Sequence, residues 1–346
     1  MDPRGPATEL IDDPTGAVGR LEERTGAQFE SIARAREYTA DELERLGGII
    51  DSSALSDRLS LVLCGSYARR ELTPGSDDDW ALIALDPFPP YDPDVVRAMA
   101  ACQAQLGQEG KAPGAQDVFG VPFDVETLVL NVGLDADSNT NLTRRMLLLL
   151  ESHELLGTIH TKAWDQILER YLNYGIKDYR PPRFLLNDIV RYWRTICVDF
   201  EGKHAQGDGD DPKWVSRNAK LRTSRKLLYA GGLVPVLLCH LIPAADMRAF
   251  LSRWLKAPPT DRLAAAFLLC AAEDEGARTL GAYDRWVALM RNEDAREALK
   301  NLRQADRPES PLWAEIHQIG EDFQRGLMAL LFSTPLRPLA PQYAIF

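Results

Sequence analysis

Cysteine is scarce in this 346-residue chain. The five cysteines form no Cys-x-x-Cys pair, and their odd number leaves at least one without a disulfide partner. Several lie in apolar surroundings, as Cys64 does at the end of the run Leu61-Val62-Leu63. This usage excludes a disulfide framework and a cysteine-rich zinc site. It predicts reduced, buried thiols in a cytoplasmic protein.

Long apolar runs and an excess of basic residues are also missing. The longest apolar stretch, 233–245, is shorter than the roughly 20 residues of a membrane span, and Pro235 and Pro243 interrupt it. The start of the chain is polar, so we expect no signal peptide and no membrane partner. Asp and Glu number 51 against 40 Lys and Arg, a formal net charge of −11. Such an acidic chain is a poor candidate for a general nucleic-acid coat or a membrane-surface protein.

Predicted strands gather early in the sequence and predicted helices gather late. Apolar runs predict strands at 59–64, 79–85 and 122–131. Apolar periodicity predicts helices at 26–48, 93–107, 141–156, 161–174, 183–203, 213–229, 244–256, 260–273, 277–304 and 309–332. This order favours an α+β (or α/β) fold, with a small mixed sheet followed by an α-helical bundle. We predict an N-terminal helical segment at 1–50, a catalytic domain at 51–157 and a C-terminal helical domain at 158–346.

The turn after the first predicted strand has the composition of a phosphate-binding loop. Gly65 has no side chain, so a ligand can approach the backbone closely there. Ser66 offers a hydroxyl and an N–H group at the start of a short predicted helix, and helix N-termini favour phosphate. These two residues are therefore candidate ligands for a nucleotide phosphate.

The chain enters the second predicted strand through Ser76-Asp77-Asp78-Asp79. Side chains alternate along an extended segment, so Asp77 and Asp79 share one face and Asp78 faces away, toward solvent or a supporting position. Two neighbouring carboxylates repel unless a cation neutralises them. Carboxylate oxygens suit Mg²⁺, which is commonly shared with substrate phosphates. The pattern predicts metal-assisted phosphoryl or nucleotidyl transfer.

A third carboxylate would complete a site for two metal ions. The third predicted strand offers Asp124 and Glu126, which lie two residues apart and so on one face. We prefer Asp124, an aspartate on an otherwise apolar strand, as the ligand of the second ion. It would also serve as the base that helps deprotonate an acceptor hydroxyl.

The whole segment, Gly-Ser-Tyr-Ala-Arg-Arg-Glu-Leu-Thr-Pro-Gly-Ser-Asp-Asp-Asp at 65–79, resembles a known signature. It is similar to that of the DNA polymerase β-type nucleotidyltransferase superfamily, above all to the branch containing the PII-protein uridylyltransferases. The segment 141–157 resembles the helix that follows the third strand in that branch. The resemblance implies triphosphate binding by Gly65 and Ser66, and it implies that Asp77 and Asp79 are metal ligands.

Other features of the branch are matched or missing in particular places. Arg69 stands in its Arg-x-Glu pattern, and with Ser76 it is a candidate nucleotide-binding residue. The chain has no His-Asp dipeptide and no Gly-Gly-Leu-Arg-Asp segment. We therefore expect neither the uridylyl-removing activity nor PII regulation.

The predicted helix at 213–229 is basic and free of acidic residues. Lys213, Arg217, Lys220 and Ser224 recur at spacings of four, three and four, which places them on one helix face. Such a face either is solvated and pairs with acidic neighbours or contacts a triphosphate. Helical domains of the superfamily commonly supply a lysine for this purpose, and the resemblance implies Lys220.

The sequence thus predicts a cytoplasmic enzyme that moves an NMP from an NTP to a hydroxyl acceptor and releases pyrophosphate. The expected cofactors are two Mg²⁺ ions, with Mn²⁺ as a substitute. The acceptor, whether protein, small molecule or RNA, stays open. The alternative is a non-catalytic or regulatory nucleotide-binding protein of the same fold, for instance in a toxin–antitoxin pair.

Overall fold

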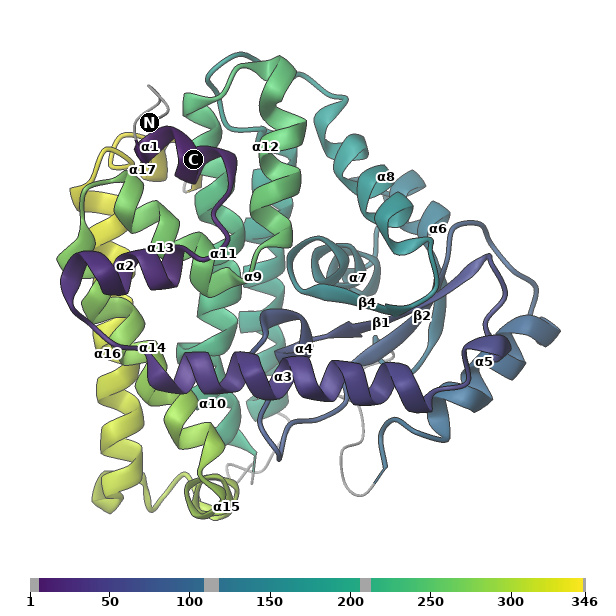
Figure 1. The fold of residues 1–346 in the computed structure, drawn as a ribbon, viewed down its shortest axis with the longest axis horizontal. Helices are drawn as coiled ribbons and strands as arrows, with labels where there is room; N and C mark the ends of the chain where they lie inside the picture. Colours follow the sequence, from purple (N-terminus) through teal and green to yellow (C-terminus); the bar gives the residue numbers. More distant parts are fainter. Residues whose placement is uncertain (1–5, 109–117, 206–212, 345–346) are drawn as a thin grey trace. The chain divides into compact units, whose positions relative to one another are not determined.

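The computed structural model describes residues 6–108, 118–205 and 213–344, coloured along the chain in Figure 1. The chain divides into two compact units: unit 1 is Met1–Ala33 with Gly175–Phe346, and unit 2 is Arg34–Tyr174. Helix α3 (Glu30–Ile49) begins in unit 1 and continues into unit 2. The fold is α+β, as predicted, with a small mixed sheet followed by helices.

Unit 2 contains a sheet with the strand order β3-β2-β1-β4. Strand β1 (Leu59–Cys64) pairs antiparallel with β2 (Trp80–Ala84) and with β4 (Ser152–Leu156). Strand β3 (Pro122–Asp124) pairs parallel with β2. The other elements of unit 2 are α4 (Ser66–Arg69), α5 (Pro93–Gln103), α6 (Val125–Leu130), α7 (Asn139–Leu150) and α8 (His160–Leu172).

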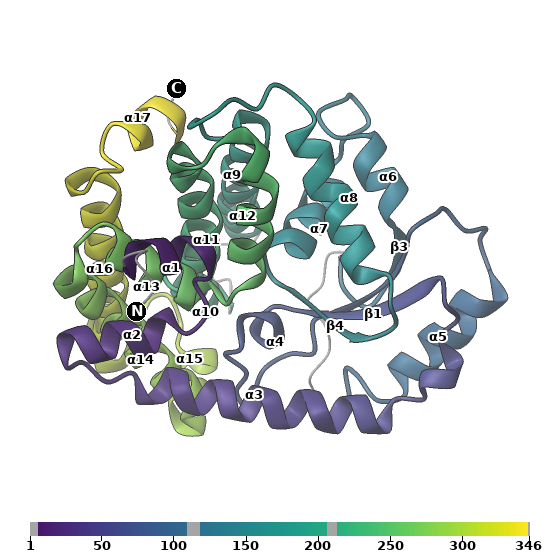
Figure 2. The same cartoon turned by 45° about the horizontal axis from the view of Figure 1, so that its top comes forward.

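Helices cover both faces of this sheet (Figure 2). On one face, Leu61 and Leu63 of β1 belong to an apolar cluster with Leu46 of α3. On the other face, Cys64 packs with Leu147 of α7. Every residue of β1 and β2 is buried, which explains why their continuous apolar runs predicted both strands correctly.

Two predicted elements of unit 2 are wrong in part. The strand expected at 122–131 stops at Asp124, because the Asp124 carboxylate accepts the Thr127 N–H at 2.7 Å and so caps α6. The helix expected at 141–156 stops at Leu150, and the next residues form β4. The sequence Ser-His-Glu-Leu-Leu of β4 lacks the apolar alternation that predicts a strand.

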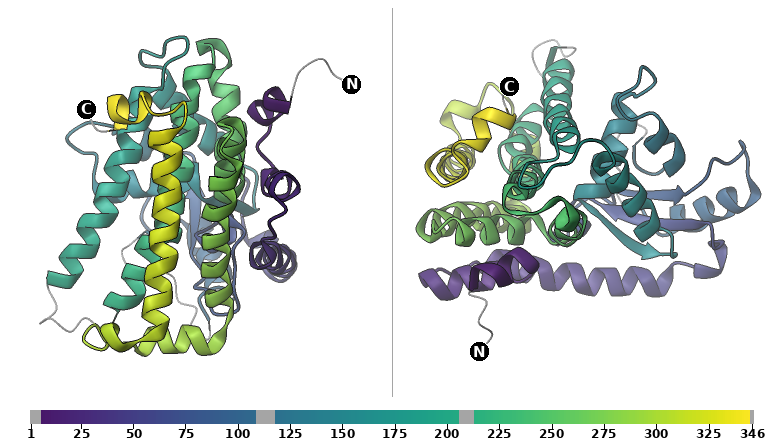
Figure 3. Two further views of the ribbon diagram at one scale, coloured as in Figure 1. Left: turned by 90° about the vertical axis from the view of Figure 1, so that its left-hand side faces the viewer. Right: turned by 90° about the horizontal axis from the view of Figure 1, so that it is seen from above.

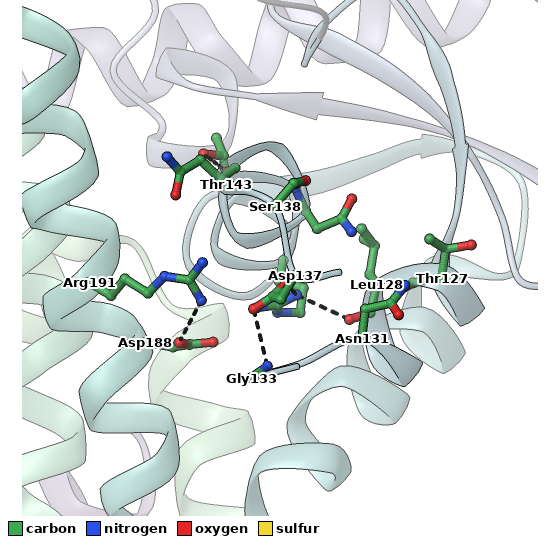
Figure 4. Close-up of polar contacts among 12 residues, drawn as sticks. Thr127, Leu128, Asn131, Gly133, Asp137, Ser138, Thr143, Asp188 and Arg191 are labelled. Atoms are coloured by element: carbon green, nitrogen blue, oxygen red, sulfur yellow. Dashed lines mark hydrogen bonds and ion pairs between the residues drawn. The ribbon is translucent and has the colours of Figure 1, made fainter. Parts of the chain in front are cut away.

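A buried arginine joins the helices α6, α7 and α8. Arg145 of α7 forms a bidentate pair with Asp137, with distances of 2.7 and 2.9 Å. It also donates to the Tyr171 hydroxyl at 2.9 Å and to the Leu128 carbonyl at 3.1 Å. The Asp137 carboxylate in addition accepts the Gly133 N–H at 3.2 Å (Figure 4). Both charged side chains are almost inaccessible to solvent, so they require each other.

Unit 1 is helical throughout its described part. Its elements are α1 (Pro6–Asp12), α2 (Ala17–Thr25), α9 (Arg183–Ala205), α10 (Trp214–Arg222), α11 (Ser224–Leu238), α12 (Ala244–Lys256), α13 (Pro259–Leu269), α14 (Glu273–Arg291), α15 (Glu293–Asn301), α16 (Pro311–Ser333) and α17 (Leu339–Ala344). The long helices α9 and α11 run side by side in opposite directions (Figure 3). The helix predicted at 213–229 is broken at Thr223, whose φ of −121° and ψ of −94° are not helical.

The two units differ from the division predicted at residues 50 and 157. Residues 6–33 pack with unit 1, where the Ile32 N–H donates to Asp284 of α14 at 2.8 Å. Helix α8 extends unit 2 to Tyr174 because it packs on α6 and α7. Within the described residues, none of the helices has the length and apolar character that crossing a membrane requires.

Candidate active site

Gly65 occupies a turn that no other residue could fill without rearrangement. Its φ of 63° and ψ of −132° suit glycine. A Cβ atom there would lie 2.8 Å from Oδ2 of Asp79. The Cys64 N–H donates to the Asp79 carbonyl at 2.7 Å, so β1 ends where β2 begins. The antiparallel pairing therefore brings the glycine turn directly against one predicted metal ligand.

The three consecutive aspartates differ in environment. Asp77 is exposed, Asp78 is buried and Asp79 is half-buried. The Asp78 carboxylate accepts the Tyr67 hydroxyl and the Gly107 N–H, each at 2.9 Å. Asp78 thus fixes the loop from inside and does not face solvent. The alternation of side chains predicts that its two neighbours face the other way.

Tyr67 remains a hydrogen-bond donor to Asp78 across the ordinary pH range. Burial raises the pKa of the Tyr67 phenol, and the negative charge of Asp78 raises it further. Because Tyr67 follows Ser66 directly, this bond connects the phosphate-loop candidate to the aspartate segment. Ser66 itself is half-buried at the start of α4, and its carbonyl accepts the Glu71 N–H at 2.8 Å.

Arg69 lies between two buried carboxylates. Its Nε donates to Glu71 at 3.0 Å and its Nη1 to Glu151 at 2.5 Å. The Arg69 side chain is 14% exposed, and those of Glu71 and Glu151 are 5% and 7% exposed. Arg69 therefore anchors the turn to the residue that precedes β4, and two carboxylates already neutralise its charge.

Glu151 is a site residue to which the sequence had given no role. Burial raises the pKa of the Cys64 thiol, and the charges of Glu151 and then Asp79 raise it further. Both carboxylates thus act on one buried thiol at the end of β1. The β1–β4 register explains this, since Cys64 pairs with Ser152, the residue after Glu151. Only knowledge of that pairing could have assigned Glu151 to this edge.

Asp124 does not join Asp77 and Asp79. The parallel register pairs Asp124 with Ala84, five residues beyond Asp79. At roughly 3.3 Å per residue, this is about 16 Å along β2. The Asp124 carboxylate caps α6, and Glu126 is exposed in the first turn of that helix. Both candidates for the third carboxylate therefore lie toward the opposite end of the strand.

The remaining predicted residues are placed as follows. The Ser76 hydroxyl accepts the Thr73 N–H at 3.0 Å and closes the turn before the aspartates. Lys220 belongs to unit 1, where it is exposed in the last turn of α10. Across residues 6–108, 118–205 and 213–344, no three His, Cys, Asp or Glu side chains form a group that could hold a metal ion.

Comparison with known proteins adds no assignment to this geometry. No protein-family model matches the chain, and neither does any curated protein sequence.

Proposed function

We propose that the chain is a metal-dependent nucleotidyltransferase that moves an NMP from an NTP to a hydroxyl acceptor. The observation that carries the proposal is the approach of the Gly65 turn to the Asp79 carboxylate. Metal-assisted nucleotidyl transfer requires a backbone that accommodates phosphate close to a carboxylate that binds a cation. Both would be present at this strand end.

The aspartate pair suits one Mg²⁺ ion bound together with a nucleotide. The alternation of side chains predicts that Asp77 and Asp79 offer oxygen donors on one side of an extended segment, and Asp77 is exposed to solvent. Mg²⁺ is usually held by one or two carboxylates, with phosphate and water oxygens completing its octahedron. When bound, the ion would neutralise charge on the phosphates. The proposed site contains neither Asp124 nor Glu126.

The protein's own residues would then orient the reaction. Gly65 lets the backbone turn closely against Asp79, and the Ser66 N–H and hydroxyl would bind the triphosphate. The acceptor hydroxyl loses its proton to solvent as its oxygen attacks the α-phosphorus. The bond between the α-phosphorus and the oxygen that bridges to the β-phosphorus breaks, and pyrophosphate leaves. The Tyr67–Asp78 bond and the Arg69–Glu151 pair keep the strand ends in place during these events. The triphosphate contact that the resemblance implies for Lys220 stays a prediction.

The test is transfer of label from four α-labelled NTPs in the presence of Mg²⁺ or Mn²⁺ and cell lysate. We expect Asp79→Asn and Asp77→Asn each to lower transfer at least about 100-fold, because the metal contributes several kcal/mol to the transition state. EDTA should abolish transfer. Undiminished label transfer by Asp79→Asn would contradict the assignment of Asp79 as a metal ligand.

Asp124→Asn is the matched variant, and it separates the sequence prediction from the structure. Asparagine caps helices about as well as aspartate, so α6 should persist. We expect Asp124→Asn to retain most of the transfer activity. If Asp124→Asn were as inactive as Asp79→Asn, the three carboxylates predicted from the sequence would be correct. The proposed site, which omits Asp124, would then be incomplete.

One observation favours the alternative of a non-catalytic nucleotide-binding protein. The predicted base, Asp124, lies away from the glycine turn, and Arg69 is neutralised by carboxylates. Calorimetry that detects NTP binding, together with no transfer to any lysate component, would support that reading. We also propose a cytoplasmic location, since all five cysteines are free and suit a reducing compartment.

A further inference from the structure

A stacked aromatic pair fixes how α9 and α11 of unit 1 meet. The rings of Trp193 and Tyr229 lie 5.1 Å apart between centroids, with an angle of 16° between their planes. Both side chains are half-buried, so each presents part of its surface to solvent. Because the helices are antiparallel (Figure 3), one turn forward on α9 meets one turn back on α11.

Three cations lie on the neighbouring turns of α9 and α11, and all three act on Cys197, one turn beyond Trp193. Arg194 follows Trp193 on α9, and Arg225 and Lys226 lie one turn before Tyr229 on α11. Arg194 is exposed, and the other two are partly exposed. Among the described residues, none of the three side chains has a carboxylate partner within ion-pair distance. We call these five residues the α9/α11 basic face.

The neighbourhood leaves this face positively charged. Glu201 lies one turn beyond Cys197 on α9, and Glu321 of α16 is bonded to Arg222 at 3.2 Å. No Asp or Glu occurs between Lys213 and Ala245. Burial lowers the pKa of Lys226 and the charge of Arg222 lowers it further, whereas Glu321 and Cys197 act in the opposite direction and more weakly. A phosphate beside Lys226 would therefore stabilise its charged form.

Cations beside aromatic rings form the combination that binds single-stranded nucleic acid. Guanidinium groups hold phosphate oxygens through paired hydrogen bonds, and bases of any identity stack on aromatic side chains. An acidic peptide would use the cations alone and leave the rings without a role.

We propose that the α9/α11 basic face binds single-stranded RNA. Arg194, Arg225 and Lys226 hold the phosphates, and a base packs on the Trp193 ring. This inference does not depend on the proposed function.

Binding is measured with the full chain in EDTA, without NTP, by the anisotropy of a labelled RNA of about 12 nucleotides. Three phosphate contacts predict a slope of log K against log salt near −2, or about 20-fold weaker binding at 200 than at 50 mM salt. The double variant Arg194→Gln/Arg225→Gln should bind the RNA more weakly. Because one phosphate contact remains, its affinity should fall only about 3-fold between 50 and 200 mM salt.

Two further variants make the test specific. Trp193→Leu should weaken binding by about 5-fold or more with an unchanged salt slope, because stacking involves no counterion. Arg278→Gln is the matched control, since its side chain is 70% exposed on α14 of the same unit, and it should bind as the unmodified chain does. Thermal melting of each variant confirms that it is folded.

Three results would overturn the inference. They are no RNA binding at 50 mM salt, an unchanged salt slope in the double arginine variant, and equal competition by polyglutamate, which would indicate an acidic protein partner. None of them affects label transfer to other acceptors, so the transferase proposal would stand. Conversely, RNA binding without any label transfer would support RNA binding by the α9/α11 basic face and contradict the proposed transferase activity.

Discussion

At the scale of single residues, the candidate site depends on a few local constraints. Gly65 must be glycine because its φ is positive and because the Asp79 carboxylate lies against it. The Asp78 carboxylate needs hydrogen-bond donors from the protein because it is buried. Its neighbours Asp77 and Asp79 are not buried. These constraints concern neighbouring strand ends and are largely independent of the rest of the molecule.

The Tyr67–Asp78 bond provides a prediction at this scale. Tyr67→Phe removes one of two donors to a buried carboxylate, which should lower the free energy of unfolding by about 1–3 kcal/mol. It should also reduce label transfer, because Asp77 and Asp79 flank the loosened residue. Urea denaturation and the transfer assay measure the two effects.

Tyr91→Phe is the control, since Tyr91 is 91% exposed, and it should change neither quantity. If Tyr67→Phe were as stable and as active as the unmodified chain, the hydrogen bond would have no positioning role.

At the scale of elements, unit 2 is held together by a charge pair as well as by apolar packing. The Arg145 guanidinium contacts Asp137, the Leu128 carbonyl and the Tyr171 hydroxyl, and so links three helices. These helices cover the sheet face that Cys64 and Asp79 share.

Arg145→Met should destabilise the protein by about 3–5 kcal/mol, because it leaves the Asp137 carboxylate buried without its partner. Adding Asp137→Leu should restore part of the loss, since the unpaired charge is then removed. The midpoint and slope of urea unfolding, followed by circular dichroism, measure both variants.

Arg278→Met, which changes an exposed ion pair, should alter the free energy of unfolding by less than about 1 kcal/mol. A loss for Arg145→Met as small as this would show that the buried pair contributes little.

At the scale of the whole molecule, one unit is inserted in the other. Unit 2 is a continuous segment, whereas unit 1 is assembled from both ends of the chain. The apolar clusters around β1 and β2 use residues of unit 2 alone. A segment with its own core can fold by itself.

We therefore expect a fragment of residues 30–174 to unfold in one cooperative urea transition. The shorter fragment 51–157, which the sequence suggested as the catalytic domain, should not. It lacks α3 and α8, and with them the buried Leu46 and Trp164. Non-cooperative unfolding of the longer fragment would show that unit 2 depends on unit 1.

The net charge of −11 has different meanings at different scales. As a sum over the chain it argues against a general nucleic-acid coat. It does not describe α10 and the start of α11, where every charged residue is basic. A local binding face depends on where the charges lie, and the net charge of the whole chain does not reveal it.

The sequence by itself determined the features whose causes are local. Apolar runs predicted β1 and β2, apolar periodicity predicted most helices, and the order of these elements predicted an α+β fold. The spacing of Gly65, Ser66, Asp77 and Asp79 singled out the turn that the structure places at one strand end. The chemistry assigned to that turn stays a prediction.

Tertiary structure alone decided which distant residues meet that turn. Strand register is set by pairing and packing between segments far apart in the sequence. The residues around a carboxylate on a strand therefore do not indicate which strand pairs with it. Register moved Asp124 away to cap α6 and brought Glu151 to Arg69 beside Cys64. It also required β4, a strand whose own residues do not predict it, because the free edge of β1 supplies its hydrogen bonds.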